Sequence, residues 1–532
     1  MRHFRLADRD LGTLAAGRPS PDTLGELRKA QLSRHLLLLG EILKVETPLW
    51  YAAAPSRPAL ADPATGLYAA TAVAAMRSGG RPPERPTLVS TAPIVTVTCE
   101  DLTLSVRLED ADPLRDRLGL PPTGRLTPAE IAHWQHMLSK SWQLLVRRHR
   151  PSAEILAEVL RVIVPVEPDP AADGVSATSA HAYGALAMSA PTDPVSLAVG
   201  LLHETAHSLL NATTLLFDLV RPTRALGYSP WRDDPRPTSG ILHGAYAYLA
   251  VTRFWRTDAM LGGGRRAQFE FARWRTAVAD AADSLLATHG PGGSRGDDPV
   301  LTPAGRRFVG ALRDEVGQWL EEPVDREVAR LASGANLDHR VRWRLRNLRV
   351  SEESTRALVD AWRSGRPAPE PPVAEVVAGA RRLEVSGRLR LAHQWLRDTE
   401  HGDAGASRKQ DPDPGDDTGS AGERNAGSGG GALPAGVGPG RDGAQGDHRG
   451  RAGGGVWPGD VAWLGGEYGT GRDAYVRALE NAGVTAPLGE IDAALAGLAL
   501  VSGHRVLRER PEVVRAVWLA RPALEALLAW LS

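Results

Sequence analysis

A segment near the C-terminus constrains the fold most. Residues 399–455 consist largely of Gly, Asp, Arg, Ser and Ala and contain almost no large apolar side chain. Such a segment cannot bury enough apolar surface to offset the entropy that is lost when a chain becomes ordered. We therefore predict a disordered linker between a main domain, residues 1–398, and a small helical module, residues 456–532.

The length, charge and cysteine content of the chain exclude several classes of protein. A chain of 532 residues is too long for one core, and Lys+Arg and Asp+Glu are equal at 63 each, so no basic field attracts nucleic acid or anionic lipid. Cys99 is the single cysteine, which excludes an intramolecular disulfide and fits a reducing compartment. No apolar run reaches the roughly 18 residues of a membrane span, and the first residues do not form a signal peptide. We expect a soluble cytoplasmic protein with no nucleic-acid or membrane partner.

Apolar periodicity in the main domain predicts an α+β fold that is mostly helical, with a small sheet. Two pairs of residues are typical of helix starts, namely Thr127 with Pro128 and Asp193 with Pro194. The Thr or Asp side chain accepts hydrogen bonds from free backbone N–H groups of the first turn, and proline suits the next position because it has no N–H group that would need a partner. We expect the helix that starts at Asp193 to lie beside a strand over 175–189. The predicted helices span 21–46, 127–148, 153–164, 193–220, 242–260, 268–288, 303–321, 325–331 and 338–348, and two further strands span 94–99 and 102–108.

The C-terminal module is apolar and helical in pattern. Leu464-Gly465 with Tyr468, followed by Tyr475, resembles the first helix of a tetratricopeptide repeat. A single helical hairpin is not an array, so a small helical end module without repeat character is the alternative. In either form the module is a candidate docking surface for partner proteins.

The segment His203-Glu204-Thr-Ala-His207 predicts a metal site on a helix. Residues four apart lie on one face of a helix, so both histidines can direct a ring nitrogen at one ion. Glu204 sits beside that face, where it can act on a metal-bound water or orient a ligand. The surrounding residues are apolar, so the helix is expected to be buried, and buried histidines need partners that a metal supplies. Chance occurrence of the pentapeptide is the alternative.

A third ligand is less well specified by the sequence. The extended zinc-protease pattern fails, because its glycine and third histidine are absent, and no glutamate follows until Glu270, which lies in a different apolar pattern. His243, at the start of the next predicted helix, remains as the candidate that would complete a three-histidine face. Its alternative role is a capping or core histidine, and Asp233 and Asp234 are weaker candidate ligands.

Together with the metal pentapeptide, four stretches make the chain similar to a known family over about residues 1–365. The family comprises HExxH-motif peptide-modification proteins encoded beside ribosomally made peptide natural products, regarded as 2-oxoglutarate-dependent HExxH-type peptide β-hydroxylases. The stretches are Gln31-Leu-Ser-Arg-His-Leu-Leu-Leu-Leu39, Val175-Ser-Ala-Thr-Ser179 with Tyr183-Gly-Ala185, Tyr228-Ser-Pro-Trp-Arg232 through Arg236-Pro237 to Leu242-His-Gly-Ala-Tyr246, and Asp338-His-Arg-Val-Arg-Trp-Arg-Leu-Arg-Asn347.

The resemblance implies an oxidoreductase that uses Fe(II) and 2-oxoglutarate to hydroxylate a β-carbon of residues in a ribosomally synthesised precursor peptide. It also implies that His203, His207 and His243 hold the iron. Two histidines and a carboxylate are the commoner ligand set, so Glu204 or an aspartate of the loop is the alternative third ligand.

The resemblance further implies a place for 2-oxoglutarate. Arg232 and Arg236 lie in the corresponding loop, and a guanidinium matches the distal carboxylate with two parallel donors. Each of them can equally be a surface arginine in a proline-rich turn. Ser176 and Thr178 add hydroxyl donors to the same pocket, with strand packing as their alternative role.

A basic run in the last predicted helix has two interpretations. It can form a surface for an acidic leader or substrate peptide, or a solvated face with internal ion pairs. The run consists of Arg340, Arg342, Arg344, Arg346 and Arg349, with Trp343 among them.

Two other functions remain open at this stage. A zinc metallopeptidase that trims a leader peptide would use Glu204 as general base and a zinc-bound water as nucleophile. A non-catalytic partner protein would keep the metal for structure and use its C-terminal helices for docking. Arg232 and Arg236 separate the hydroxylase from the metallopeptidase, since only a hydroxylase needs them for a co-substrate.

Overall fold

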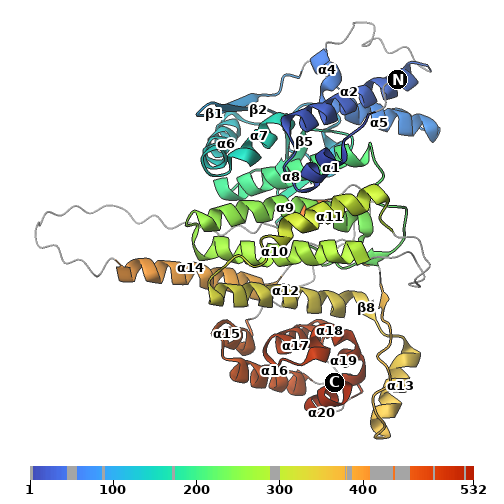
Figure 1. Cartoon of the computed structure of the whole chain (residues 1–532), viewed down its shortest axis with the longest axis vertical. Coiled ribbons are helices and arrows are strands. Elements are labelled where there is room, and N and C mark those ends of the chain that lie inside the picture. The colour runs from blue at the N-terminus through green and yellow to red at the C-terminus, as the bar shows by residue number, and fades with distance from the viewer. Residues whose placement is uncertain are drawn as a thin grey trace, which may run out of the picture.

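Helices form most of the molecule and lie in successive layers against a mixed sheet (Figure 1). Beyond the sheet come α8 (Pro194–Thr214), α9 (Thr238–Met260), α10 (Gly264–Ala287) and α12 (Arg326–Asn347), and the C-terminal helices form the far end. The computed structural model describes residues 4–44, 57–86, 90–170, 174–287, 300–377, 379, 386–407, 435–437, 456–482, 486–520 and 523–532.

The main sheet contains the order β1 (Ile94–Cys99), β2 (Leu102–Leu108), β3 (Val162–Val166), β5 (Ala185–Ser189) and β4 (Val175–Thr178). β1 and β2 form an antiparallel hairpin, as the sequence predicts, with exposed and buried residues alternating along β1. β3 pairs in parallel with β2 and β5, and β4 pairs antiparallel with β5. β3, β4 and β5 are buried throughout, as expected for strands covered on both faces.

Two helix starts follow the capping pattern in the sequence. Thr127 and Glu130 form a reciprocal capping box at the start of α6 (Pro128–Arg148). The Asp193 carboxylate accepts hydrogen bonds from the backbone N–H groups of Val195 and Ser196 and so starts α8.

Two predicted elements near the sheet are wrong. The helix over 153–164 ends early, as α7 (Arg150–Val159), because the β-branched run that follows pairs in the centre of the sheet as β3. The single strand over 175–189 is two strands joined by a turn at Gly184, which has φ 84° and lies where a Cβ would be 2.5 Å from the carbonyl oxygen of Val159.

Two predicted helix boundaries also differ. α8 ends at Thr214 rather than near 220. At its end the Thr213 and Thr214 hydroxyls donate to backbone carbonyls of the preceding turn, and Val220, beyond the helix, forms a β-bridge with Leu301. The predicted helices over 325–331 and 338–348 are one continuous helix, α12, capped by Asp325.

Three buried apolar clusters hold the layers together. The largest fills the space between the sheet and the helices from α6 to α11 (Pro303–Gly317), and a smaller one joins α2 (Pro21–Leu43) and α5 (Pro63–Arg77) to the sheet. The third joins α10 and α12 to the C-terminal helices, with Phe269, Leu331, Leu495 and Val514 among its members. The C-terminal helices thus share a core with α12.

Helix α14 (Gly387–Ser407) extends into the predicted linker. Strand β10 (Ala435–Val437) also falls within it and pairs in parallel with β4. Residues 408–434 and 438–455 of the predicted linker lie outside the described residues.

The segment with a tetratricopeptide-like pattern does not form one helix. Leu464 ends α15, Gly466 has φ 74° in the turn, and Tyr475 lies in α16, so the pattern is divided between two helices. In its described residues the C-terminal module is helical. Among the described residues, no helix is long and apolar enough to cross a membrane. The remaining bounds are α1 (Asp8–Ala15), α2 (Pro21–Leu43), α4 (Arg57–Ala61), α5 (Pro63–Arg77), η1 (Arg115–Leu118), β6 (Leu226–Gly227), β7 (Arg236–Pro237), α11 (Pro303–Gly317), β8 (Leu348–Arg349), α13 (Glu352–Arg363), β9 (Glu375–Val376), α14 (Gly387–Ser407), α15 (Pro458–Leu464), α16 (Tyr468–Ala482), α17 (Leu488–Val501), α18 (Arg505–Glu509), α19 (Pro511–Trp518) and α20 (Leu524–Leu531).

Candidate metal centre

The two histidines of the pentapeptide face each other on α8. Their Nε2 atoms are 3.1 Å apart and their rings meet nearly at right angles, at 81°. Burial lowers the pKa of His203 to about 4, and burial together with the neighbouring histidines lowers the pKa of His207 well below its usual value. Both imidazoles are therefore neutral near pH 7, which is the form that binds a metal ion.

His243 lies beside this pair on α9. Its ring stacks on that of His207 with centroids 5.7 Å apart, and its pKa is lowered to about 4 by burial and by the charge of Arg236. The three predicted histidines are thus neighbours. No three His, Cys, Asp or Glu side chains in the described part of the chain are arranged to hold a metal ion as they stand. His203 and His207 therefore form the donor pair, and His243 is adjacent to it.

Glu204 faces the sheet. Its Oε1 accepts a hydrogen bond of 2.7 Å from the Ser176 hydroxyl of β4, and Thr178 of the same strand also bonds to it. No described residue donates a hydrogen bond to the buried Oε2 atom. Burial raises the pKa of Glu204 to about 7 against the opposing effect of the two hydroxyls. Ser176 and Thr178, expected as co-substrate donors, are placed here on the glutamate.

Aromatic side chains pack against the histidine pair. Tyr248 of α9 lies 5.3 Å from His203 between ring centroids, and Trp231 stacks on Tyr248 at 5.0 Å. Trp231 also covers Gly244, where a Cβ would lie 2.0 Å from its indole nitrogen. Tyr248 was not among the residues predicted from the sequence, although it lies on the same helix as His243, five residues further on.

The two candidate co-substrate arginines share one carboxylate. Arg232 is buried and its Nη2 lies 2.9 Å from Asp234, and the Nη1 atom of Arg236 lies 3.4 Å from the same residue. Arg236 also lies against Gly240 in the first turn of α9 and acts electrostatically on His243. Asp234 therefore pairs with both arginines, and the charge of Arg236 also acts on His243.

The aspartates considered as alternative ligands are both paired with arginines. Asp234 bonds the two loop arginines, and Asp233 forms a 2.9 Å ion pair with Arg346 of α12. The backbone oxygen of Asp233 also accepts a 2.8 Å hydrogen bond from the Asn347 side chain. These contacts indicate an anchoring role for Asp233 rather than a ligand role.

The basic run of α12 makes internal contacts. The pairs are Arg340 with Asp280, Arg342 with Asp338, Arg344 with Glu512 and Arg346 with Asp233, and Arg349 donates to backbone carbonyls at the helix end. Of the two interpretations of the run, the contacts favour internal ion pairs.

No protein-family model matches the chain, and no curated protein is significantly similar to it. Two neutral imidazoles with adjacent Nε2 atoms fit a divalent transition metal, and a buried carboxylate with one unpaired oxygen stands beside them.

Proposed function

We propose that the chain is an Fe(II)- and 2-oxoglutarate-dependent hydroxylase of a ribosomally synthesised precursor peptide, acting at a β-carbon. The proposal takes its substrate from the resemblance in the sequence and its chemistry from the site. The observation that carries it is the histidine pair with facing Nε2 atoms, together with the Arg236 side chain, which lies against Gly240 three residues before His243. Imidazole ligands contribute no negative charge, so a metal ion held by them, with a guanidinium nearby, favours a dianionic co-substrate.

Each residue of the site has a separate role in this proposal. His203 and His207, with His243 beside them, would hold Fe(II), which with 2-oxoglutarate and oxygen supplies the oxidising power for C–H hydroxylation. Arg236 orients the co-substrate through its carboxylate. Tyr248 and Trp231 line the pair with apolar surface and limit the access of water.

The proposal is tested by incubating the full chain with Fe(II), 2-oxoglutarate, oxygen and a cognate precursor peptide. Succinate and a peptide heavier by one oxygen are expected. Arg236→Met should raise the KM for 2-oxoglutarate by about tenfold to a hundredfold, as the loss of a charge-assisted hydrogen bond of 1.5–3 kcal/mol does, without loss of bound metal. Arg340→Met, at an exposed pair on α12, is the matched control. Peptide-bond cleavage with zinc alone, indifferent to 2-oxoglutarate, would overturn the proposal.

One observation favours a zinc metallopeptidase as a second candidate. The pKa of Glu204, raised to about 7 by burial, suits a general base that works near neutral pH. Glu204→Gln separates the two functions, because it removes the base that a peptidase needs, whereas a hydroxylase needs no base at this position and keeps partial activity.

A further inference from the structure

A line of charged side chains connects the loop of the metal centre with the C-terminal helices. Asp233, Asp338, Arg388 and Asp460 are buried, and Arg342 is largely covered. The members, which we call the α12 charge chain, are in spatial order Asp233 of the loop, Arg342 and Asp338 of α12, Arg388 of α14 and Asp460 of α15.

Three of the four links are short. Arg342 Nε lies 2.8 Å from Asp338 Oδ2, Arg388 Nη1 lies 2.6 Å from Asp338 Oδ1, and Arg388 Nε lies 2.7 Å from Asp460 Oδ1. The fourth link, from Arg342 Nη1 to Asp233 Oδ1, measures 3.9 Å. Although burial acts to raise the pKa of Asp338, the charges of Arg342 and Arg388 hold it below its usual range, so the carboxylate stays ionised. Ionised groups this deep interact strongly and keep a fixed geometry.

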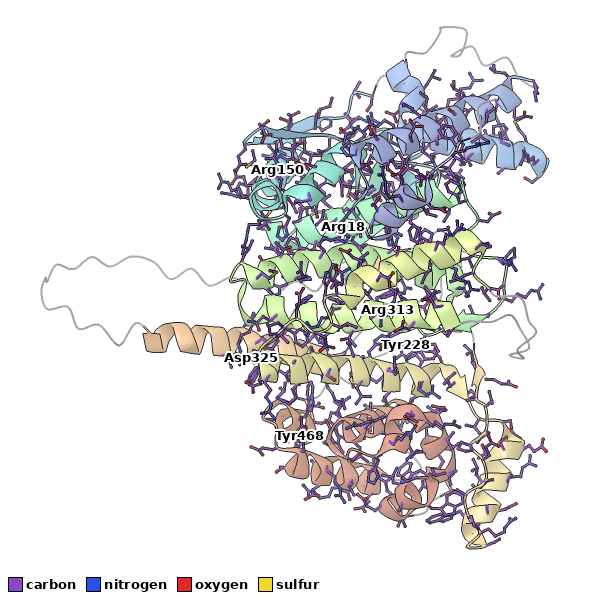
Figure 2. The ribbon with its side chains drawn as sticks, viewed as in Figure 1. Arg18, Arg150, Tyr228, Arg313, Asp325 and Tyr468 are labelled. Carbon is purple, nitrogen blue, oxygen red and sulfur yellow. The ribbon has the colours of Figure 1, made fainter. Side chains whose placement is uncertain are left out.

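At one end, α12 holds the loop directly. Besides the Arg342 link, Asp233 contacts Arg346 and Asn347 at 2.9 and 2.8 Å. Tyr228, at the start of the loop, lies at the level of α12 in Figure 2, and its hydroxyl is 2.9 Å from Nδ1 of His339. These contacts fix the loop just before it reaches Asp234 and Arg236.

At the other end, α12 and Arg388 hold the C-terminal helices. Arg388 donates from Nη2 to the backbone oxygen of Ala493 in α17 at 2.6 Å. Arg344 forms an ion pair with Glu512 of α19, and Arg330 donates to the backbone oxygens of Trp463 and Leu464. One helix therefore carries both the loop and the C-terminal helices.

We propose that the C-terminal helices position the loop of the metal centre through the α12 charge chain. Asp233, Asp338, Arg342 and Arg388 are positioning residues, since their contacts given above join the loop, α12, α14 and α15 and do not include His203, His207 or His243. The inference rests on the proposed function in one respect, namely that Arg236 of this loop binds the anionic co-substrate. A partner that binds the C-terminal helices and shifts α12 would then change the affinity for that co-substrate.

Two variants of the full-length protein test the proposal. Asp233→Asn changes the loop end of the α12 charge chain, and Arg388→Met changes the far end without touching the loop. Amide hydrogen exchange over residues 228–237 should become faster in both variants by about twofold to thirtyfold, as expected for coupling through such a network. Exchange within α9 and the amount of bound Co(II) should stay unchanged, because the histidines are held by other helices.

A kinetic measurement distinguishes positioning from a purely structural role. The KM for 2-oxoglutarate should rise in both variants while kcat stays within about twofold of that of the unmodified chain. The double variant should exceed neither single variant, because both changes interrupt one chain, whereas distant independent sites add. Arg340→Met, on the same helix but paired with the exposed Asp280, is the control and should leave all readouts unchanged.

Several results would overturn the inference. They are unchanged exchange over 228–237 in Arg388→Met, equally faster exchange in α9 and the loop, and additive effects in the double variant. If Arg388→Met does not fold, Arg388→Lys takes its place, since it keeps the charge but cannot bond Asp338 and Asp460 together. If the unmodified chain hydroxylates nothing, the proposed function fails and the exchange measurement still decides the positioning role.

Discussion

The histidine pair and the residues packed on it depend on a few close contacts, and the tightest is at Gly244. A Cβ at this position would lie 2.0–2.3 Å from three atoms of the Trp231 indole. Because no side chain tolerates such contacts, Gly244→Ala should displace Trp231 and with it the loop. We expect a loss of about 1–3 kcal/mol in the free energy of unfolding, measured with urea, and weaker use of 2-oxoglutarate.

Gly310→Ala is the matched control for this change. Gly310 lies within α11 and a Cβ there meets nothing within 4 Å, so alanine should stabilise the helix by about 0.5–1 kcal/mol. Equal stability of Gly244→Ala and the unmodified protein would show that the Trp231 contact is not as tight as described.

His149 predicts a pH dependence away from the metal centre. It is buried and stacks on Phe254 at 4.1 Å, and burial lowers its pKa to about 4 from 6.5, with a smaller contribution from Arg148. The unfolded chain therefore binds a proton between pH 6.5 and 4 that the folded protein does not. The free energy of unfolding therefore has its full value above pH 6.5 and decreases by about 3 kcal/mol as the pH falls toward 4.

The measurement is the free energy of unfolding at several pH values for the unmodified protein and for His149→Leu. The variant should lose this part of the pH dependence, whereas His136→Gln, at an exposed position of α6, should keep it. Identical pH profiles of His149→Leu and the unmodified protein would contradict the assignment.

At the scale of elements, two helices form the candidate metal centre, and a separate outcome is expected for the histidines of each helix. α8 supplies the donor pair His203 and His207, and α9 supplies His243 beside it. A metal ion at about 100 times its Kd should stabilise the folded protein by about 2.7 kcal/mol. This stabilisation should vanish in His203→Ala and His207→Ala and decrease in His243→Ala, as measured by thermal unfolding with and without Co(II).

Metal analysis of the same three variants completes the test. Full metal content in His243→Ala would place the third ligand elsewhere. Full metal content in His207→Ala would contradict metal binding by the histidine pair. Asn211→Ala, one turn after His207 on the same helix, controls for general damage to α8 and should keep the metal.

The sequence specified the elements whose signal is local. The pair on α8 follows from a spacing of four residues, and α6 follows from its Thr127 cap. The strand β3 was not predictable from its flanking pattern, because Val162–Val166 continues an apolar run and becomes a strand only through pairing with β2 and β5. The bonds from Ser176 and Thr178 to Glu204 and the anchoring of Asp233 on α12 join residues far apart in the chain, so periodicity carries no sign of them.

At the scale of the whole molecule, the C-terminal helices complete a core rather than form an appendage. α12 contributes Leu331, Ala335 and Leu345 to the apolar cluster that also holds α17 and α19 (Figure 1). The two sides meet again at Arg388 and Asp460, one on each side of the predicted linker. From the sequence these helices are predicted to be a separate module and a candidate docking surface, whereas here they also share a core with α12.

Two changes to the chain separate the linker from the helices that follow it. Replacing residues 408–434 and 438–455 by Gly/Ser sequence of equal length should leave the melting temperature and the turnover unchanged, because such polar, glycine-rich sequence has little apolar surface to bury.

Ending the chain at residue 398 should instead expose the apolar face of α12 and leave Asp338 and Arg388 without Asp460 beside them. Losing one partner of a buried ion pair costs about 3–5 kcal/mol, and the exposed face promotes aggregation, so the shortened protein should unfold at lower urea concentration or precipitate. Urea unfolding and light scattering of both proteins make the comparison. A shortened protein with unchanged stability and turnover would mean that the C-terminal helices are an independent module, and it would also contradict their role in positioning the loop.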